Sequence, residues 1–346
     1  MSQEFREFVR KIGSGVHTHQ DLTRSEMHRA MTLMLTQEAT PAQIGAFLIA
    51  HRIKRPTGDE LAGMLDAYEE WGPQLPTLGT TQPVVVLTQP YDGRDRTLPL
   101  SPLTALVLAS AGFPVLQHGG ERMPTKEGLP LVAVWQALGI DWRPYSLSQV
   151  HQILATAGLG FVYMPRHFPQ AAALVPYRRE IGKRPPLATL ELLWVPYQGP
   201  YHLVAGYVHP PTEQIMRAAL KARGVTAFTT VKGLEGSCDL PQNRTAIVGL
   251  GAEERCLLKP QEYDLSGPNI PLTEGMTQMA AVLRGETVPL RNALLWNAGF
   301  CLWRLGAVPS IEAGIHQTAT LLDDQTVRQR LDQLIGIAEK VITYTH

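Results

Sequence analysis

The sequence contains few cysteine residues. Its 3 cysteines among 346 residues are Cys238, Cys256 and Cys301, which lie far apart and form no Cys-x-x-Cys pair. This spacing argues against a structural zinc site and is typical of proteins in a reducing compartment. We therefore expect a cytoplasmic protein.

The sequence also lacks long apolar runs and an excess of one charge. No stretch reaches the roughly 18 consecutive apolar residues that indicate a membrane-spanning helix. The N-terminal "MSQEFREFVRKIGSG" has no apolar segment of the kind found in signal peptides. Lys and Arg number 31, as do Asp and Glu. This balance argues against a general nucleic-acid binder, although it permits a local basic patch, and we expect no membrane contact.

Helix-start signals fill the first third of the chain. Thr23 is followed three residues later by Glu26, and Thr57 by Glu60, the spacing of a capping box. Thr40 precedes Pro41, an N-cap followed by proline at the first helical position. The pattern predicts a small bundle of three capped helices.

Short β-branched runs then alternate with helical segments. Residues 84–87 ("VVVL") read as a buried strand, followed by a helix in "SPLTALVLASAGF" and strands in "PVLQHGG", "GFVYMP", "HLVAGYVH", "AFTTVKG" and "RTAIVGLG". The Pro-rich stretches "KRPPLATLELLWVPYQGP" and "EYDLSGPNIPLTEG" read as connections, and the chain closes with two helices. The predicted fold is α/β, a small N-terminal helical bundle plus a large α/β domain with a mainly parallel sheet.

Four segments together carry a family resemblance. "AQIGAFLIAHRIKRPTGDELAGM", "ASAGFPVLQHGG", "PYRREIGKR" and "LLWNAGFCLWRLG" occur in the same order as similar segments of the anthranilate phosphoribosyltransferase family, glycosyltransferase family 3. The resemblance implies a nucleoside phosphorylase/phosphoribosyltransferase-like fold. It implies a helical domain of residues 1–78, joined by helices from about 168–196, and an α/β domain of residues 79–346.

The resemblance also implies a homodimer formed through the helical domain. The apolar residues Phe47, Leu48, Leu61 and Leu65 could supply the dimer face, and they fit the core of the bundle equally well.

The family's phosphate-binding turn corresponds to "TQPYDG" in this sequence. Asp92 and Gly93 keep the family pattern, whereas Thr88, Pro90 and Tyr91 stand in place of glycines. Proline removes a backbone N–H, and proline and tyrosine both resist positive φ, so the turn is poorly suited to wrap a diphosphate. Asp92 and Gly93 are candidate donor-site residues, or simply an ordinary turn after a strand.

Two further family motifs place candidate donor-site residues. The "N-x-S-T" motif reads "PLSP" and keeps Ser101, which could contact an anion or cap the following helix. The stretch "QHGG" keeps His118 and Gly119 of the family's "K-H-G-N". His118 lies at a strand end, where open α/β sheets bind ligands, although a buried histidine with satisfied hydrogen bonds fits as well.

The last motifs concern the acceptor and the metal. Arg178 aligns with the arginine that holds the acceptor's carboxylate in the family, and part of its basic run could instead be solvated surface. The family's acidic pair reads Glu235-Gly236, so Glu235 is a candidate metal ligand, or a loop hydrogen-bond acceptor. One carboxylate holds Mg²⁺ poorly, and the sequence leaves open whether Asp239 or Glu253 replaces the missing acid. Mg²⁺ is expected only if the chain is active.

These substitutions resemble a divergent branch of the family that carries "G-x-E-G" and is described as not catalysing the anthranilate reaction. We expect a protein that does not perform the standard transfer to anthranilate and binds a small anionic or aromatic ligand in the cleft between its domains. One alternative is an active transferase with an altered substrate. Another is a nucleic-acid-binding dimer that uses the basic runs "HRIKR" and "RREIGKR".

Overall fold

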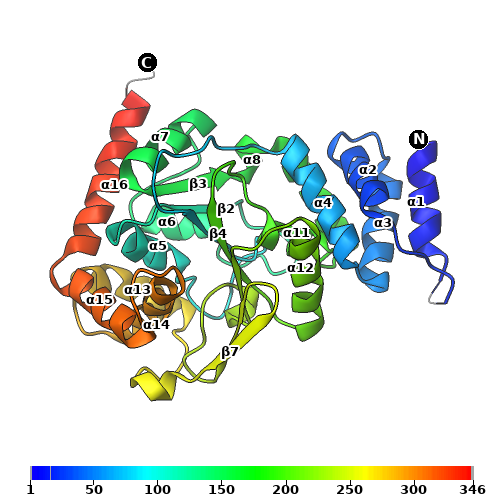
Figure 1. Cartoon of the computed structure of the whole chain (residues 1–346). Coiled ribbons are helices and arrows are strands. Elements are labelled where there is room, and N and C mark those ends of the chain that lie inside the picture. Colours follow the sequence, from blue (N-terminus) through cyan, green and yellow to red (C-terminus); the bar gives the residue numbers. More distant parts are fainter. Residues whose placement is uncertain (1, 16, 344–346) are drawn as a thin grey trace.

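The structure is a computed structural model, and it describes residues 2–15 and 17–343. Its N-terminal part is a bundle of helices, on the right of Figure 1. They are α1 (Gln3–Gly13), α2 (Arg24–Leu35), α3 (Pro41–Lys54) and α4 (Gly58–Trp71).

Capping boxes begin three of these helices; the sequence predicted those of Thr23 and Thr57, and at Thr40 it predicted the N-cap but not the box. In each, the threonine hydroxyl accepts from the backbone N–H of the third helical residue, whose side chain accepts from the threonine N–H; the pairs are Thr23–Glu26, Thr40–Gln43 and Thr57–Glu60. The first helix, α1, was not predicted. It is capped by Ser2 and buries Phe5, Phe8 and Ile12 against the bundle.

The centre of the molecule is a seven-stranded sheet with strand order β3-β2-β1-β4-β5-β6-β7. The strands are β1 (Val84–Leu87), β2 (Val115–Gly119), β3 (Leu159–Tyr163), β4 (Tyr201–Gly206), β5 (Phe228–Val231), β6 (Ala246–Leu250) and β7 (Glu254–Leu258). The strands from β1 to β5 pair in parallel, and β6 and β7 add an antiparallel edge. The predicted bundle and mainly parallel sheet are therefore confirmed.

Helices cover the sheet and close the chain. The longer helices of this part are α5 (Ser101–Ser110), α7 (Leu147–Ala157), α12 (Pro210–Ala222), α13 (Leu272–Leu283), α14 (Pro289–Arg304), α15 (Ile311–Asp323) and α16 (Thr326–Thr343), and the short α6 (Leu131–Ala137) lies between α5 and α7 in the chain. The described part of the chain thus ends with four helices, α13 to α16, and the prediction of two was wrong.

Shorter helices occupy the middle of the chain. They are α8 (Met164–His167), α9 (Pro169–Ala172), α10 (Val175–Ile181), α11 (Leu187–Leu193) and the 3₁₀ turns η1 (Leu234–Gly236) and η2 (Pro260–Tyr263). The stretch from 183 to 200 is therefore not only a connection, because it contains α11. Helix α10 contacts α3, and α11 contacts α4.

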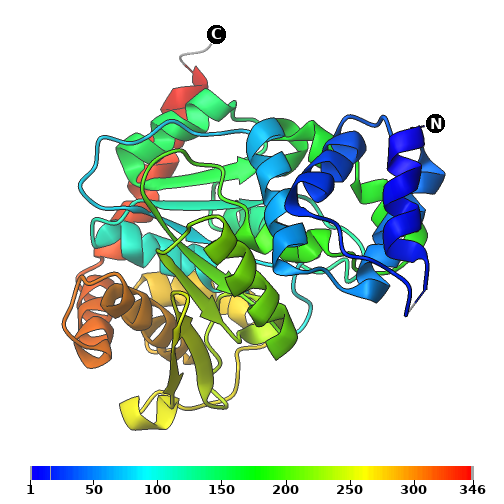
Figure 2. The same cartoon turned by 45° about the vertical axis from the view of Figure 1, so that its right-hand side comes forward.

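Helix α4 joins the bundle to the α/β part. It packs on α12 so closely that a Cβ on Gly58 would lie 2.5 Å from Ala218 Cβ. Arg223, which follows α12, donates from Nε to Asp66 Oδ1 at 2.9 Å. Figure 2 shows the two parts side by side after a turn of the molecule. The bundle is therefore joined to the α/β part by close packing and by an ion pair.

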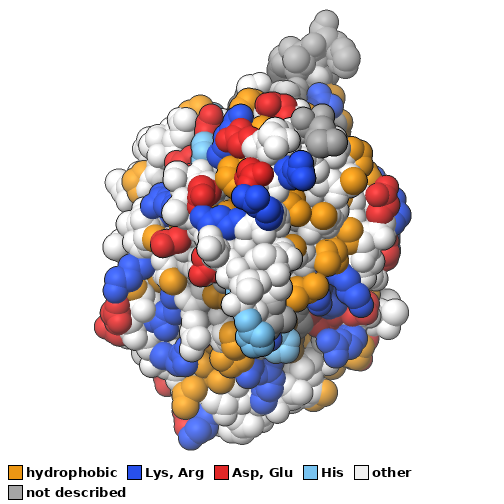
Figure 3. Space-filling view, turned by 90° about the vertical axis from the view of Figure 1, so that its right-hand side faces the viewer, with side chains coloured by type: hydrophobic (Ala, Val, Ile, Leu, Met, Phe, Trp, Pro, Cys, Tyr) orange, Lys and Arg blue, Asp and Glu red, His pale blue; other side chains and the backbone are white. Residues whose placement is uncertain are grey.

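The outer face of the bundle bears on the dimer prediction. Phe47, Leu48, Leu61 and Leu65 are all buried within the chain, so they form the bundle core and not an exposed face. Figure 3 views the side on which the bundle lies and shows acidic and basic side chains interspersed with hydrophobic ones. The homodimer stays a prediction.

Two findings concern the chain as a whole. No helix of the described residues is long and apolar enough to span a membrane. The cysteines Cys238, Cys256 and Cys301 are free thiols. Burial raises the pKa of Cys238 well above its ordinary value, which makes a reactive thiolate unfavourable there.

Candidate functional site

The turn after β1 is fixed by two glycines. Gly93 has φ +77°, a left-handed conformation, and its N–H donates to Pro90 O at 3.0 Å. A Cβ on Gly93 would lie 2.4 Å from the Gly128 carbonyl carbon, so the backbones approach too closely for a side chain. Gly128 N–H donates to Asp92 O at 2.9 Å. Gly93 therefore has a clear structural role at this turn.

Tyr91 fills space beside His118. The Tyr91 hydroxyl lies 2.5 Å from His118 Nδ1, and His118 Nε2 lies 2.9 Å from the Trp194 carbonyl oxygen. A neutral imidazole satisfies both contacts by accepting at Nδ1 and donating from Nε2. Complete burial lowers the pKa of His118 to about 4. His118 is thus buried and satisfied, and it does not line the large cleft described below.

Ser101 and Gly119 lie in the buried layer between α5 and the sheet. Ser101 is the first residue of α5 and makes no capping hydrogen bond, so the capping role considered for it was wrong. Its hydroxyl accepts from Gln117 Nε2 at 2.9 Å, and Gln117 Oε1 accepts from Trp135 Nε1 at 2.9 Å. Gly119 ends β2 with little free space, since a Cβ would lie 3.3 Å from Phe161.

A buried ion pair occupies the start of α5. Asp239 Oδ2 accepts from the backbone N–H of Leu100, the N-cap of α5, at 2.9 Å and from Arg94 Nη1. Its other oxygen accepts from Gln89 Nε2 at 3.1 Å. Arg94 is 1% exposed and also donates to Ser237 Oγ at 3.2 Å. The anion at this helix start is therefore the chain's own carboxylate.

Glu235 is held by a group of donors on the segment that follows the turn. Its carboxylate accepts from the backbone N–H groups of Asp95 (3.3 Å), Arg96 (3.3 Å) and Thr97 (3.0 Å), and from the Thr97 hydroxyl (2.8 Å). Lys126 Nζ donates to it at 2.9 Å. Successive N–H groups that converge in this way form an anion-binding nest. These donors lower the pKa of Glu235.

These acidic side chains do not fit a Mg²⁺ ion. Mg²⁺ requires carboxylate oxygens free of competing cations. The carboxylate of Glu235 is bonded to Lys126, and that of Asp239 to Arg94. Glu253 lies away from both, at the turn between β6 and β7, where it pairs with Lys221 at 3.2 Å. No cluster of three His, Cys, Asp or Glu residues able to hold a metal occurs among residues 2–15 and 17–343.

Arg178 is engaged inside the protein. It is 3% exposed, and its guanidinium pairs with Glu191, with Nη1 donating to Oε2 at 3.2 Å. The Glu191 carboxylate favours the charged guanidinium and raises the pKa of Arg178. Nη1 also lies 3.0 Å from Met123 Sδ. A guanidinium held in this way is not free to grip an incoming carboxylate unless Glu191 moves.

A large cleft of about 750 Å³ opens beside the turn. Of the predicted site residues, Asp92 and Glu235 line it, and Ser101, His118 and Arg178 do not. Arg184 Nε donates to Asp92 Oδ2 at 3.0 Å. The basic side chains of the lining are Arg96, Lys126, Arg184, Lys232 and Arg244.

A second hollow of about 950 Å³ continues the first and shares Arg184, Ala188, Thr189, His209 and Thr212 with it. Its lining adds Arg52, Arg55 and Lys183 and contains no acidic residue. We call the two hollows together the basic cleft. Its acids, Asp92 and Glu235, are each bonded to a cation of the lining. Among the described residues, no carboxylate pairs with Arg55, Lys183, Lys232 or Arg244.

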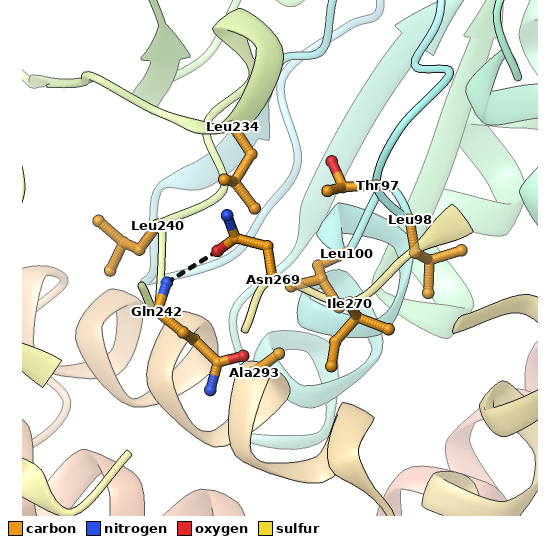
Figure 4. A pocket seen from close by; sticks show the side chains of 9 residues that line it. All are labelled: Thr97, Leu98, Leu100, Leu234, Leu240, Gln242, Asn269, Ile270 and Ala293. Carbon is orange, nitrogen blue, oxygen red and sulfur yellow. Dashed lines mark hydrogen bonds between the residues drawn. The ribbon is translucent and has the colours of Figure 1, made fainter. Parts of the chain in front are cut away.

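A much smaller cavity lies between Thr97 and Leu234, with mostly apolar walls (Figure 4). In it, the backbone N–H of Gln242 donates to Asn269 Oδ1 at 3.1 Å. Its volume of about 10 Å³ is close to that of one water molecule, so it is not a ligand site.

Several residues of the site were not anticipated from the sequence. Arg94 and Gln89 were not recognised as partners of Asp239, and Lys126 and Lys232 were not considered. The signal available in the sequence was "GRDR", two arginines directly after the turn. The role of Arg94 could not be predicted from this signal, because its partner Asp239 lies 145 positions further along the chain.

Comparison with known proteins identifies the family. The helical bundle domain model of a glycosyl transferase family matches residues 6–72, and the α/β domain model of the same family matches residues 92–326. An anthranilate phosphoribosyltransferase of Symbiobacterium thermophilum is 30% identical over 94% of this chain and 95% of its own length. One of Methylobacterium nodulans is 28% identical over 96% and 98%.

Solved structures show the same fold. Anthranilate phosphoribosyltransferase of Thermus thermophilus has a TM-score of 0.79 at 21% identity, covering 98% of this chain and 100% of its own. That of Saccharomyces cerevisiae, in complex with PRPP and Mg, has a TM-score of 0.81 at 15% identity and covers 98% and 99%. Because the α/β domain model alone matches more than half of the sequence, this chain belongs to the glycosyl transferase family that includes the anthranilate phosphoribosyltransferases.

Proposed function

We propose that this protein does not perform the standard phosphoribosyl transfer to anthranilate and that it binds a small anionic ligand in the basic cleft. The observation that carries the proposal is the Arg94–Asp239 ion pair at the start of α5. A diphosphate placed at this helix start would meet the Asp239 carboxylate, and two anions there repel each other. The Leu100 N–H that the anion would use is already bonded.

The turn before this pair supports the same conclusion. Pro90 has no N–H to donate, and the Tyr91 side chain occupies the turn with its ring buried against His118. Mg²⁺, which neutralises a leaving diphosphate, does not fit the paired carboxylates of Glu235 and Asp239. Removing a single preorganised donor at a reacting oxyanion typically costs about 3 kcal/mol in rate, so several such losses would leave little activity.

The basic cleft supports the choice of an anionic ligand. Lys232 and Arg244 face one hollow and Arg55 and Lys183 the other, all without a carboxylate partner in the described chain. Cations concentrated in a concave site raise the local concentration of anions. The nearby apolar side chains of Val208 and Ile53, 41% and 66% exposed, could contact the body of an organic anion.

The proposal is tested by two assays on the purified protein. Incubation with anthranilate, PRPP and Mg²⁺ should leave the anthranilate fluorescence unchanged, and turnover would contradict the first half. Titration with inorganic tripolyphosphate should show binding that is lost in R55A/K183A/K232A. The control K259A/R328A/K340A removes the same charge away from the cleft and should bind normally. Equal binding by both triple variants would place the anion site elsewhere.

Nucleic acid is a second candidate ligand, favoured by one observation. The two basic runs singled out in the sequence converge here, because Arg52 and Arg55 come from "HRIKR" and Lys183 and Arg184 from "RREIGKR". Lys54 does not contribute, since it is buried with Glu60 at 2.8 Å. A labelled single-stranded oligonucleotide should then bind with an affinity that falls steeply as salt rises, and R55A/K183A/K232A should not bind it. Absent or salt-independent binding would exclude this candidate.

A further inference from the structure

The donors around Glu235 amount to an oxyanion cradle that the chain fills with its own side chain. The N–H groups of residues 95–97, the Thr97 hydroxyl and Lys126 all converge on a single carboxylate. Two guanidinium groups stand behind them, with Arg94 Nε 3.6 Å and Arg96 Nε 3.8 Å from the carboxylate oxygens. Arg94 also pairs with Asp239, but the five donors bonded to Glu235 exceed the roughly four lone-pair sites of one carboxylate.

The cradle lies at the wall of the basic cleft. Arg96, Lys126 and Glu235 all line the hollow of about 750 Å³. The Arg96 side chain is 76% exposed and that of Lys126 is 21% exposed, whereas that of Glu235 is 4% exposed. An anion in the cleft can therefore reach the rim of the cradle, and the carboxylate that fills it has open volume on the cleft side into which to move.

The backbone of η1 brings the carboxylate into the cradle. Glu235 has φ 55° and ψ 21°, a left-handed conformation that residues other than glycine adopt infrequently. Gly233 and Gly236 flank it, and Gly236 also has positive φ. A short segment bounded by glycines can change its dihedral angles without moving the sheet.

We propose that residues 95–97 and Lys126 form a binding site for a phosphate group, and that Glu235 closes this site by acting as a tethered competitor. The inference rests on the proposed function in one respect, since the phosphate group would enter from the basic cleft. A ligand that places a phosphate group in the cradle displaces Glu235, while the rest of that ligand contacts the cations of the cleft. Asp95, a neighbouring acid, is 54% exposed and lies 3.8 Å from Lys126.

The test uses inorganic phosphate as the probe and the full chain in each variant. In E235A the cradle is empty, and calorimetric titration should show phosphate binding at least about tenfold tighter than in the wild type. E235Q, whose amide oxygen is a weaker acceptor, should fall between the two. The double variant E235A/K126A loses the cation of the cradle and should return to the wild-type affinity.

Thermal unfolding provides the check on folding. E235A should melt below the wild type without phosphate and recover part of the loss when phosphate is added, because a ligand of the native state stabilises it. The proposed site would be overturned if E235A bound phosphate no more tightly than the wild type does. An unchanged far-ultraviolet circular dichroism spectrum would show that E235A is folded in this comparison.

The two proposals fail separately. A wild type that binds no tripolyphosphate, together with E235A that binds phosphate, contradicts the proposed function and supports the cradle. A wild type that binds tripolyphosphate, together with E235A that binds phosphate no better than the wild type, supports the basic cleft and overturns the cradle.

Discussion

The hydroxyl of Tyr91 lies 2.5 Å from Nδ1 of His118, so the side chain at a position where the family resemblance implies a glycine satisfies the buried histidine. The ring of Trp194 also packs against His118, and the backbone carbonyl of Trp194 accepts from His118 Nε2. The turn and the strand end are therefore joined by buried contacts where the family resemblance implies an open phosphate site.

Tyr91→Phe should lower the free energy of unfolding. It leaves the buried Nδ1 of His118 without a donor, which costs about 1–3 kcal/mol. Urea unfolding measures the change. Tyr177→Phe is the control, because the Tyr177 hydroxyl bonds to Gln37 at the surface and its loss should matter by less than about 0.5 kcal/mol. Equal effects of the two substitutions would show that the Tyr91–His118 contact does not contribute to the stability of the fold.

Acid should destabilise the fold through its buried histidines. Burial lowers the pKa of His118 and of His202 to about 4 from an ordinary 6.5. Between these values the unfolded chain binds more protons than the folded one, so stability is present above about pH 6.5 and falls as the pH drops toward 4. At pH 5 each histidine should cost about 2 kcal/mol.

Urea unfolding at pH 7 and pH 5 measures this loss. His202→Gln should remove roughly half of the loss due to these two groups, whereas the same substitution at the exposed His316 should leave it unchanged. A free energy of unfolding that is equal at the two pH values would contradict the assignment of neutral buried imidazoles.

Arg178→Ala should be strongly destabilising. It leaves the Glu191 carboxylate buried without its partner, which costs about 3–5 kcal/mol. Arg179→Ala is the matched control, because the Arg179 side chain is 65% exposed. The apolar double variant R178M/E191M should be more stable than R178A, since neither charge is then left unpaired. Near-equal stabilities of R178A and R179A would indicate that Arg178 is free for ligand binding after all.

Gly93→Ala tests the close crossing of the turn. Gly93 and Gly112 both have positive φ, but a Cβ meets the Gly128 backbone at 2.4 Å only at Gly93, and at Gly112 nothing lies within 4 Å. Gly112→Ala should therefore lower the free energy of unfolding only by the strain of a left-handed backbone at alanine, about 1–2 kcal/mol. Gly93→Ala should lower it clearly more. Denaturant unfolding compares the two, and equal costs would mean that the turn can open away from Gly128.

Local signals in the sequence predicted much of the fold. Thr23 and Thr57 marked helix starts because a cap and its partner lie three residues apart, and Thr40 marked one because proline follows it. Strand β1 was found because a fully buried strand is a continuous apolar run. The edge strand β7 was missed, because its residues are mostly exposed and show no such run. Helix α1 was overlooked although its buried residues Phe5, Phe8 and Ile12 recur at the spacing of three and four residues that is typical of an amphipathic helix.

The candidate site was harder to predict, because pairing across the chain decides what each residue does. Glu235 and Arg178 were recognised as candidates, but their partners were not. Lys126 lies 109 positions from Glu235 along the chain, and Glu191 lies on α11, whereas Arg178 lies on α10. A motif shows that a carboxylate or a guanidinium is present, and only the fold shows whether it is already bonded. The convergence of the two basic runs in one cleft likewise depends on the packing of α3 against α10.

The most direct test of the central claim is a calorimetric titration of the wild type with PRPP in the presence and absence of Mg²⁺. The buried Arg94–Asp239 pair at the start of α5 predicts that added Mg²⁺ will not strengthen binding. Micromolar binding that requires Mg²⁺ would contradict the account, because it would mean that the diphosphate and its metal enter a position that the chain's own carboxylate fills.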